Sequence, residues 1–494
     1  MKTSIKTADA VESLVPGTVF VPVRVIPEPR FVQETLARLP LAESVLLLWQ
    51  QVADAPFLQD LFARHRGRCY EKALSFPSLV QLIADALLQH DGSARASFER
   101  ALEEDALDVT LQAAYGKLRR LPIPVSTALL AEGTARLRAL LPLRPATAIP
   151  SSLREFAVTV LDGKAIKRVA KRLKLLRGVR GGLLGGKGLV ALELNSGLAV
   201  ALKAHPDGEV NEIRLVPALL SEVRQRLPGP RLWLGDRQFC DLDQTGRFAA
   251  EGDHFLVRYH PKVHFHPDPQ RRPRHGHDQA GRAYVEEWGW LGGAKDRRRR
   301  YVRRITLHRP GDDLILVTDL LDGDRYPATD LLTQYLGRWG IERMFHQVTE
   351  VFHLKRLIGG SPQASIFQLA FCLLLYNMIH VLRAYVAAAE HCDANDISLE
   401  KLFEDVEREL IAWSVLVDPA DTAAYFAAPP RTAAVKRRLC KLLGKVWQDR
   451  WLKAVNEKPR PHRAPEKATR SHTSVHRLLE DHRRQHKAAQ TRKL

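Results

Sequence analysis

The hydrophobic and polar positions divide the chain into a helical first part and a strand-rich middle part. Residues from about 30 to 148 carry apolar side chains at helical spacing, interrupted by proline and charged breaks, which predicts a helical module. Within it, Val109 to Arg120 is a candidate second helix of a helix-turn-helix motif capped by Thr110. An ordinary basic surface helix would show the same pattern, so both interpretations stay open. In the first interpretation, the residues near DNA phosphates would be Lys117, Arg119 and Arg120.

Beyond the proline-containing break at residues 145–150, β-branched runs alternate with helical runs. Glu155 to Asp162 is apolar, rich in β-branched residues and ends in an acid, which is typical of a buried strand that delivers one polar group. Two alternating runs over residues 188–203 flank Asn195-Ser196-Gly197 and predict a β-hairpin. The later elements are a helix over 209–227, a strand over 230–235 leading to Asp236, a strand over 254–259, a strand over 314–320 and helical patterns over 327–351 and 366–385.

This order of elements predicts an α/β fold with a ribonuclease-H-like catalytic core. A three-stranded meander followed by α/β crossovers would bring the acids on neighbouring central strands together. Residues 260–310 are basic and aromatic and interrupt the pattern, so they predict a β-rich insertion. The expected divisions are an N-terminal arm (1–35), an all-helical DNA-binding domain (36–150), the first part of the core (151–259), the insertion (260–310), the second part of the core (311–390) and a helical C-terminal region with a basic tail (391–494).

The charge balance indicates a polyanionic partner. Lys and Arg number 75 against 56 Asp and Glu in 494 residues, a net charge of +19, and nucleic acid is the leading candidate. An anionic membrane is the competing partner, but no basic amphipathic anchor or lipidation signal stands out. The apolar stretch 366–385 has polar residues inside it, which favours a buried helix over a membrane span.

The cysteines and the N-terminus favour a cytoplasmic protein. The five cysteines contain no CxxC pair, so neither a disulfide framework nor a thiolate zinc site is indicated. A zinc site among the histidines of residues 264–277 is disfavoured, because they lie in a Pro- and Arg-rich loop without cysteines. No Walker-type loop occurs, so no nucleotide cofactor is implied.

Three acids are the candidates for chemistry on DNA. Cleavage by in-line displacement needs an activated nucleophile and a stabilised leaving oxygen, which two Mg²⁺ ions held by carboxylates supply. Asp162 and Asp236 lie at predicted strand ends, and Glu342 lies on a predicted helix with Tyr335 and Arg338 at spacings that share one face. Spacing alone does not exclude a surface cluster with an Arg338–Glu342 ion pair.

The motifs around these acids resemble those of DDE transposases of the insertion-sequence-four family. Tyr335-x2-Arg338-x3-Glu342 resembles the Y-R-E signature of that family, while LDGK at Asp162 and LGDRQF at Asp236 resemble its other two acidic motifs. The downstream segment 350–379 is also similar, so the likeness covers roughly residues 105–385.

The resemblance implies a cut-and-paste DNA transposase with Asp162, Asp236 and Glu342 as catalytic residues and metal ligands. The cofactor would be two Mg²⁺ ions, for which Mn²⁺ can substitute. The partners would be the terminal inverted repeats of an insertion sequence and target DNA, with a homodimer on DNA. The alternatives are a metal-dependent nuclease without strand transfer and an inactive, transposase-derived DNA-binding protein.

The resemblance also implies DNA contacts. Tyr335 and Arg338 would contact phosphates near the transposon end. The family signature closes with a lysine where this chain has Thr349, and Lys355 or Arg356 would compensate. Trp288 and Trp290 are candidates for stacking on a flipped base, although a tryptophan pair that packs a small β-subdomain is an equal alternative.

Overall fold

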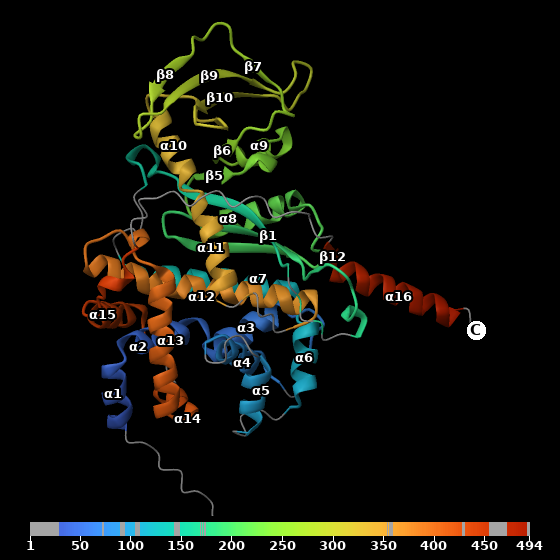
Figure 1. Ribbon diagram of the computed structural model, residues 1–494, viewed down its shortest axis with the longest axis vertical. Coiled ribbons are helices and arrows are strands. Elements are labelled where there is room, and N and C mark those ends of the chain that lie inside the picture. Colours follow the sequence, from blue (N-terminus) through green and yellow to red (C-terminus); the bar gives the residue numbers. More distant parts are fainter. Residues whose placement is uncertain are drawn as a thin grey trace, which may run out of the picture.

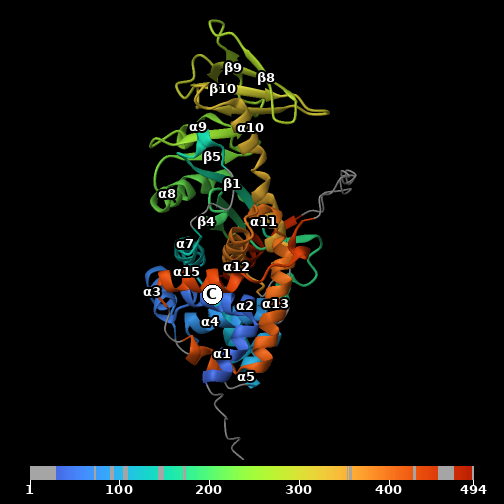
Figure 2. The same cartoon turned by 90° about the vertical axis from the view of Figure 1, so that its left-hand side faces the viewer.

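A mixed β-sheet forms the centre of an elongated molecule (Figure 1). In the part of the chain that the computed structural model describes, ten strands join this one sheet. Both views place strands β8–β10 at one end of the long axis and the N-terminal helices at the other (Figure 1; Figure 2). The described residues are 29–71, 74–88, 94–103, 109–142, 149–167, 169, 171, 174–352, 354, 359–426, 430–453 and 472–491.

Half of the sheet has the predicted meander followed by parallel strands. The strand order is β4-β3-β1-β5-β6, in which β4, β3 and β1 pair antiparallel and β1, β5 and β6 pair parallel. The predicted mixed α/β class and hairpin are confirmed. These strands are β1 (Ala157–Ala165), β3 (Lys187–Glu193), β4 (Leu198–His205), β5 (Arg231–Gly235) and β6 (His254–Arg258).

The hairpin turn is anchored to the start of β1. Gly197 has φ +70°, a conformation that glycine adopts without steric cost, and its N–H donates to the Glu193 carbonyl at 2.8 Å. The Asn195 side chain accepts from the Val158 N–H at 2.9 Å and donates to the Phe156 carbonyl at 3.2 Å. The turn therefore holds three strands in register.

The predicted β-rich insertion extends the same sheet. Strand β11 pairs antiparallel with β6, β10 follows it, and β9 pairs with β10, β7 and β8. Strands β7–β10 form the part of the molecule farthest from the N-terminal helices (Figure 1). The strand bounds are β7 (Phe265–Pro267), β8 (Arg274–His277), β9 (Ala283–Leu291), β10 (Arg300–Leu307) and β11 (Leu314–Thr318).

Helix α12 (Pro362–Ala389) connects the sheet to the helical layer. It lies beside α7 (Ile123–Ala139) beneath the sheet (Figure 1), and both helices pack against β4. Among the described residues, α12 alone is long and apolar enough to cross a membrane, and its apolar window is completely buried inside the protein. That burial agrees with the buried-helix interpretation. Two shorter helices also cover the sheet. Helix α8 (Val216–Arg226) packs on β3 and β4, and α9 (Leu242–Phe248) packs on β6.

The C-terminal helices complete the predicted N-terminal helical layer. Helices α13 and α15 pack on α2. Glu409 accepts hydrogen bonds from the backbone N–H groups of Leu41 and Ala42 at 2.8 and 3.0 Å, and Arg438 contacts Glu43 at 2.6 Å. The helices of this layer are α1 (Pro29–Arg38), α2 (Pro40–Val52), α3 (Ala55–His65), α4 (Phe76–Leu88), α5 (Ala94–Glu103), α6 (Leu111–Arg120), α13 (Leu399–Leu416), α14 (Pro419–Tyr425) and α15 (Thr432–Leu443).

The predicted basic tail contains regular structure. Strand β12 (His472–Ser474) pairs parallel with β2 (Gly182–Leu184), and α16 (Val475–Thr491) projects from this pair (Figure 1). Short 3₁₀ helices are η1 (Ser151–Leu153), η2 (Lys174–Leu176), η3 (Glu212–Leu215), η4 (Arg237–Phe239), η5 (Ala394–Asp396) and η6 (Asp449–Trp451).

Candidate active site

Asp162 and Asp236 come from neighbouring parallel strands at matching positions. Val160 on β1 pairs with Leu234 on β5, and each acid lies two residues beyond its member of this pair. Side chains two residues apart in a strand share a face, so the register directs both acids to the same side of the sheet edge. The sequence placed Asp162 at the end of its strand, but β1 continues to Ala165 because residues 162–165 still pair with β3.

The Asp162 carboxyl is mostly buried. Its Oδ1 accepts a hydrogen bond from the Gly163 N–H at 2.8 Å. Burial raises the pKa of Asp162 to about 7, the Gly163 N–H opposes this shift, and the charge of Asp236 adds to it. The raised pKa of Asp162 reflects chiefly the cost of removing its negative charge from water, to which the neighbouring Asp236 charge adds.

Asp236 caps the short helix that follows β5. Its Oδ1 accepts from the Gln238 N–H at 2.9 Å. Burial raises the pKa of Asp236, the Gln238 N–H and Arg338 lower it, and Glu342 raises it. Both acids are therefore held by backbone N–H groups and lie within the electrostatic reach of a common arginine.

The helix predicted over residues 327–351 is interrupted beside these acids. Helix α10 (Ala328–Leu336) ends at Gly337, and α11 (Trp339–Glu350) begins after Arg338. Tyr335 and Glu342 therefore lie on different helices, so the prediction of one continuous helix is wrong, but Arg338 contacts both side chains. The Gly337 N–H closes α10 by donating to the Thr333 carbonyl at 3.1 Å. The next helix, α11, follows Arg338.

Arg338 faces the carboxylates and Tyr335. Its Nη2 donates to Glu342 Oε1 at 2.7 Å, and its guanidinium lies 5.8 Å from the centre of the Tyr335 ring. Burial lowers the pKa of Arg338, but Tyr335 and Glu342 raise it, and the net shift is upward. The Arg338 side chain is 11% exposed and that of Glu342 is 42% exposed. A fixed positive charge therefore lies among Asp162, Asp236 and Glu342.

The donor chemistry of these acids fits a hard divalent cation. Carboxylate oxygens are the ligands that Mg²⁺ and Mn²⁺ prefer, and burial gives Asp162 and Asp236 raised pKa values that a cation would counteract. In the described part of the chain, no three Asp, Glu, His or Cys side chains are already gathered as a metal-binding group. The acids are instead connected through Arg338.

Tyr335 is packed inside the site. Its side chain is buried, and its hydroxyl donates to the Gly235 carbonyl at 3.3 Å, one residue before Asp236. Burial raises the pKa of Tyr335 to about 12. The hydroxyl therefore keeps its proton at neutral pH and can donate it to the Gly235 carbonyl.

The two tryptophans of the insertion lie in different environments. Trp288 is buried, donates from Nε1 to the Leu321 carbonyl at 2.9 Å and lies 3.9 Å from the Arg271 guanidinium. Trp290 is 36% exposed and lies 4.1 Å from the Arg299 guanidinium. Trp288 thus has the packing role that the alternative interpretation described, and Trp290 is the one accessible for stacking.

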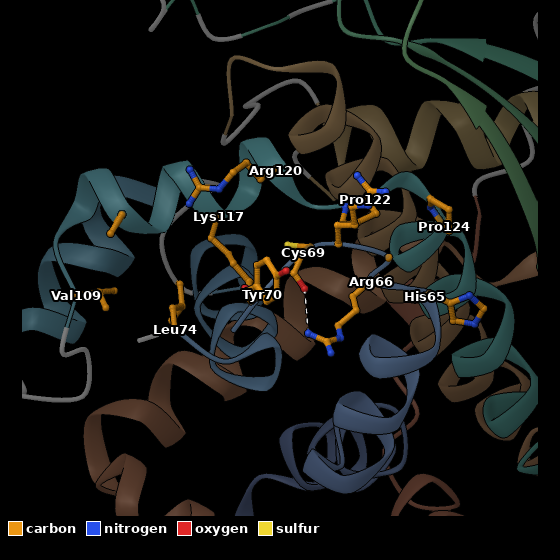
Figure 3. A pocket seen from close by; sticks show the side chains of 13 residues that line it. His65, Arg66, Cys69, Tyr70, Leu74, Val109, Lys117, Arg120, Pro122 and Pro124 are labelled. Carbon is orange, nitrogen blue, oxygen red and sulfur yellow. Dashed lines mark hydrogen bonds between the residues drawn. The ribbon is translucent and has the colours of Figure 1, made fainter. Parts of the chain in front are cut away.

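The basic residues of α6 differ in exposure to solvent. Thr110 caps the helix, as predicted, by accepting from the Ala113 N–H at 3.3 Å. Lys117 is buried and donates to the Tyr70 carbonyl at 3.1 Å. Both residues line a cavity of about 840 Å³, whose lining side chains are drawn in Figure 3. Arg119 and Arg120 are exposed, and Arg120 lines this cavity. The phosphate contacts of all three remain predictions.

The closing residue of the signature is only partly described. Thr349 lies near the end of α11, and its hydroxyl donates to the Phe345 carbonyl at 2.6 Å. Lys355 and Arg356, the predicted replacements for the missing lysine, lie outside the described residues.

Two polar side chains of the site were missed at the sequence level. Glu212 begins η3, and Lys164 lies two residues beyond Asp162 with its Nζ 5.4 Å from the centre of the Phe345 ring. Burial raises the pKa of Glu212, whereas burial lowers the pKa of Lys164. The sequence treated Glu212 only as a helix position, and no local motif marks it. The LDGK motif includes Lys164 and was the available signal for it.

Comparison with known proteins identifies one family model and one solved structure that resemble this chain. Residues 158–378 match the family model of the transposase DDE domain, and this segment contains Asp162, Asp236 and Glu342. The match supports a DDE transposase. Among solved structures, the piggyBac transposase synaptic complex with hairpin DNA, studied by cryo-electron microscopy, aligns with a TM-score of 0.39 at 10% identity, covering 83% of this chain and 88% of that chain. No curated protein matches the chain.

Proposed function

We propose that this protein is a DNA transposase of the insertion-sequence-four type, with a ribonuclease-H-like core, that cuts element ends and joins them to target DNA. The observation that carries the proposal is the paired register of β1 and β5, which directs Asp162 and Asp236 to one sheet edge. Glu342 reaches the same site from α11 through Arg338. The match of residues 158–378 to the transposase DDE domain supports this class of reaction.

The three acids would hold divalent metal, two Mg²⁺ ions or Mn²⁺ in their place. Such ions activate the attacking oxygen and stabilise the leaving oxygen of a phosphodiester. Asp162 and Asp236 would supply the fixed carboxylates, because backbone N–H groups already orient both. Arg338 would hold a DNA phosphate against the three acids. The Tyr335 hydroxyl would orient the DNA strand beside Asp236.

The proposed partners are the terminal inverted repeats of a bacterial insertion sequence and a target duplex. The net charge of +19 supports a polyanionic ligand. Two ends must be held together for joining, so we propose a homodimer on DNA. The exposed Arg119 and Arg120 of the helical layer would contact the repeats.

Cleavage of the inverted repeats that bracket the gene, with Mg²⁺ or Mn²⁺ present, tests this function. Wild-type protein should nick the repeat ends and join pre-cleaved ends to a target plasmid. Asp162→Ala and Asp236→Ala should bind the repeats and lose both reactions, whereas Glu400→Ala, an exposed acid of α13, should keep them. Cleavage at the wild-type rate by Asp162→Ala would refute the assignment of the acids.

The joining step separates the alternatives. A nuclease of the same fold would cleave the repeats and yield no joined product. An inactive DNA-binding derivative would bind the repeats and neither cleave nor join them.

A further inference from the structure

The Glu212 carboxylate packs directly on the backbone of the first acidic motif. A Cβ added to Gly163 would overlap Glu212 Oε2, so the acid occupies the space that any larger residue would take beside Asp162. Asn211 helps to set this position, because its Oδ1 accepts from the Ile213 N–H at 3.1 Å and starts η3. A larger residue at 163 would have to displace the end of the Glu212 side chain, which is distant in the sequence.

The other oxygen of the same carboxylate contacts the second acidic motif. Gln238 Nε2 donates a hydrogen bond to Glu212 Oε1. The backbone N–H of Gln238 donates to Asp236 Oδ1 at 2.9 Å. One residue thus holds Asp236 with its main chain and Glu212 with its side chain. Glu212 is the bridge between Gly163, next to Asp162, and Gln238, two residues after Asp236.

We propose that Glu212 is a positioning residue that sets the separation of Asp162 and Asp236 through Gly163 and Gln238. The inference rests on the proposed function, because it assigns a task to the pair of acids that would hold metal. Outer hydrogen-bond partners of metal ligands commonly control how well those ligands bind. The two oxygens of Glu212 face Gly163 and Gln238, which belong to the first two acidic motifs.

Removal of the bridge should weaken metal binding more than DNA binding. We expect Glu212→Ala to raise the Mn²⁺ concentration for half-saturation and to lower kcat for end cleavage, each by about 10- to 100-fold. Affinity for repeat DNA, measured by anisotropy in EDTA, should stay unchanged. Glu212→Gln keeps an acceptor oxygen for Gln238 and should recover most of both losses.

A double-mutant cycle tests the route through Gln238. Because Gln238 is one of the two contacts of Glu212, Gln238→Ala should reproduce part of the Glu212→Ala defect, and the double variant should be no worse than Glu212→Ala alone. If the losses of Mn²⁺ affinity and kcat in the two single variants multiply in the double variant, Glu212 does not act through Gln238. Wild-type Mn²⁺ binding by a folded Glu212→Ala protein would also overturn the route.

The steric part of the proposal has its own measurement. Gly163→Ala should lower the melting temperature and the affinity for Mn²⁺, because the added methyl group displaces the Glu212 carboxylate. Gly163→Ala/Glu212→Ala should recover the melting temperature and not the affinity. If Gly163→Ala alone is as stable as wild type, Glu212 does not fill the space beside Gly163 and the steric part is wrong.

The two proposals fail in different ways. Wild-type protein that binds no Mn²⁺ and cleaves no DNA would refute the proposed function, whereas wild-type protein that does both, with Glu212→Ala unchanged, would refute only the role of Glu212.

Discussion

Arg338 Nη2 and Glu342 Oε1 lie 2.7 Å apart across the first turn of α11. The same guanidinium counteracts the charges of Asp162 and Asp236. Without DNA or metal, Arg338 is thus the cation that faces Asp162, Asp236 and Glu342. It would compete with a bound metal for Glu342. DNA that draws Arg338 toward a phosphate would release Glu342 for the metal.

This competition predicts opposite effects on two measurements. Arg338→Ala should bind Mn²⁺ more tightly without DNA, by about 1 kcal/mol for loss of one partly screened charge. End cleavage by the same variant should fall by about 100-fold, as for removal of a transition-state hydrogen-bond donor. Calorimetric titration and single-turnover cleavage measure the two effects. Arg343→Ala, an exposed arginine one residue after Glu342, is the control and should change neither quantity.

The two tryptophans of β9 should respond differently to truncation. Trp288→Ala should lower the free energy of unfolding by about 3–5 kcal/mol, because it empties a buried site and leaves the Leu321 carbonyl unpaired. Trp290→Ala should leave stability near wild type and weaken repeat binding by about 1–3 kcal/mol, because base stacking is removed. Chemical denaturation and DNA titration check these outcomes. A Trp290→Ala protein with unchanged DNA affinity would contradict the stacking role.

The junction between the core and the insertion should be sensitive to pH. His254 Nδ1 lies 3.1 Å from Asp319 Oδ2, and this hydrogen bond raises the pKa of His254. A raised pKa contributes stability that is complete below the ordinary histidine value of about 6.5 and is lost as pH rises through the folded-state value. His254→Asn should therefore lower the melting temperature more at pH 6 than at pH 9. As a control, His266→Asn, at an exposed position, should not lower the melting temperature more at pH 6 than at pH 9. If His254→Asn lowers the melting temperature equally at both pH values, the His254–Asp319 ion pair does not stabilise the fold.

The basic residues of α6 should separate into stability and binding roles. Arg119→Ala/Arg120→Ala should weaken DNA binding and reduce the salt slope of log K by about 1 for each phosphate that the variant no longer binds. Lys117→Ala should lower the melting temperature, because it leaves the Tyr70 carbonyl without its donor, and should keep the slope. Filter binding at several salt concentrations distinguishes them, and an unchanged slope for the arginine pair would remove α6 from the DNA interface.

Local sequence patterns were sufficient to predict the strands and the turn near Asp162 and Asp236. The β-branched run before Asp162, the Asn195-Ser196-Gly197 turn and the strand before Asp236 each act over a few residues. Their order then predicted the meander and the parallel pair, because short connections restrict how such strands can join. The paired position of Asp162 and Asp236 could thus be expected before the structure.

Tertiary structure decided the features that depend on burial and on distant segments. Helices α10 and α11 are separated at Gly337 and Arg338, whereas a helical repeat predicts a continuous helix. Trp288 and Trp290 share β9, but Trp288 is buried and Trp290 is 36% exposed. Glu212 meets Gly163 and Gln238 only after the hairpin, η3 and β5 have packed. Periodicity reports which face of an element is apolar, but the partner on that face depends on the assembled sheet.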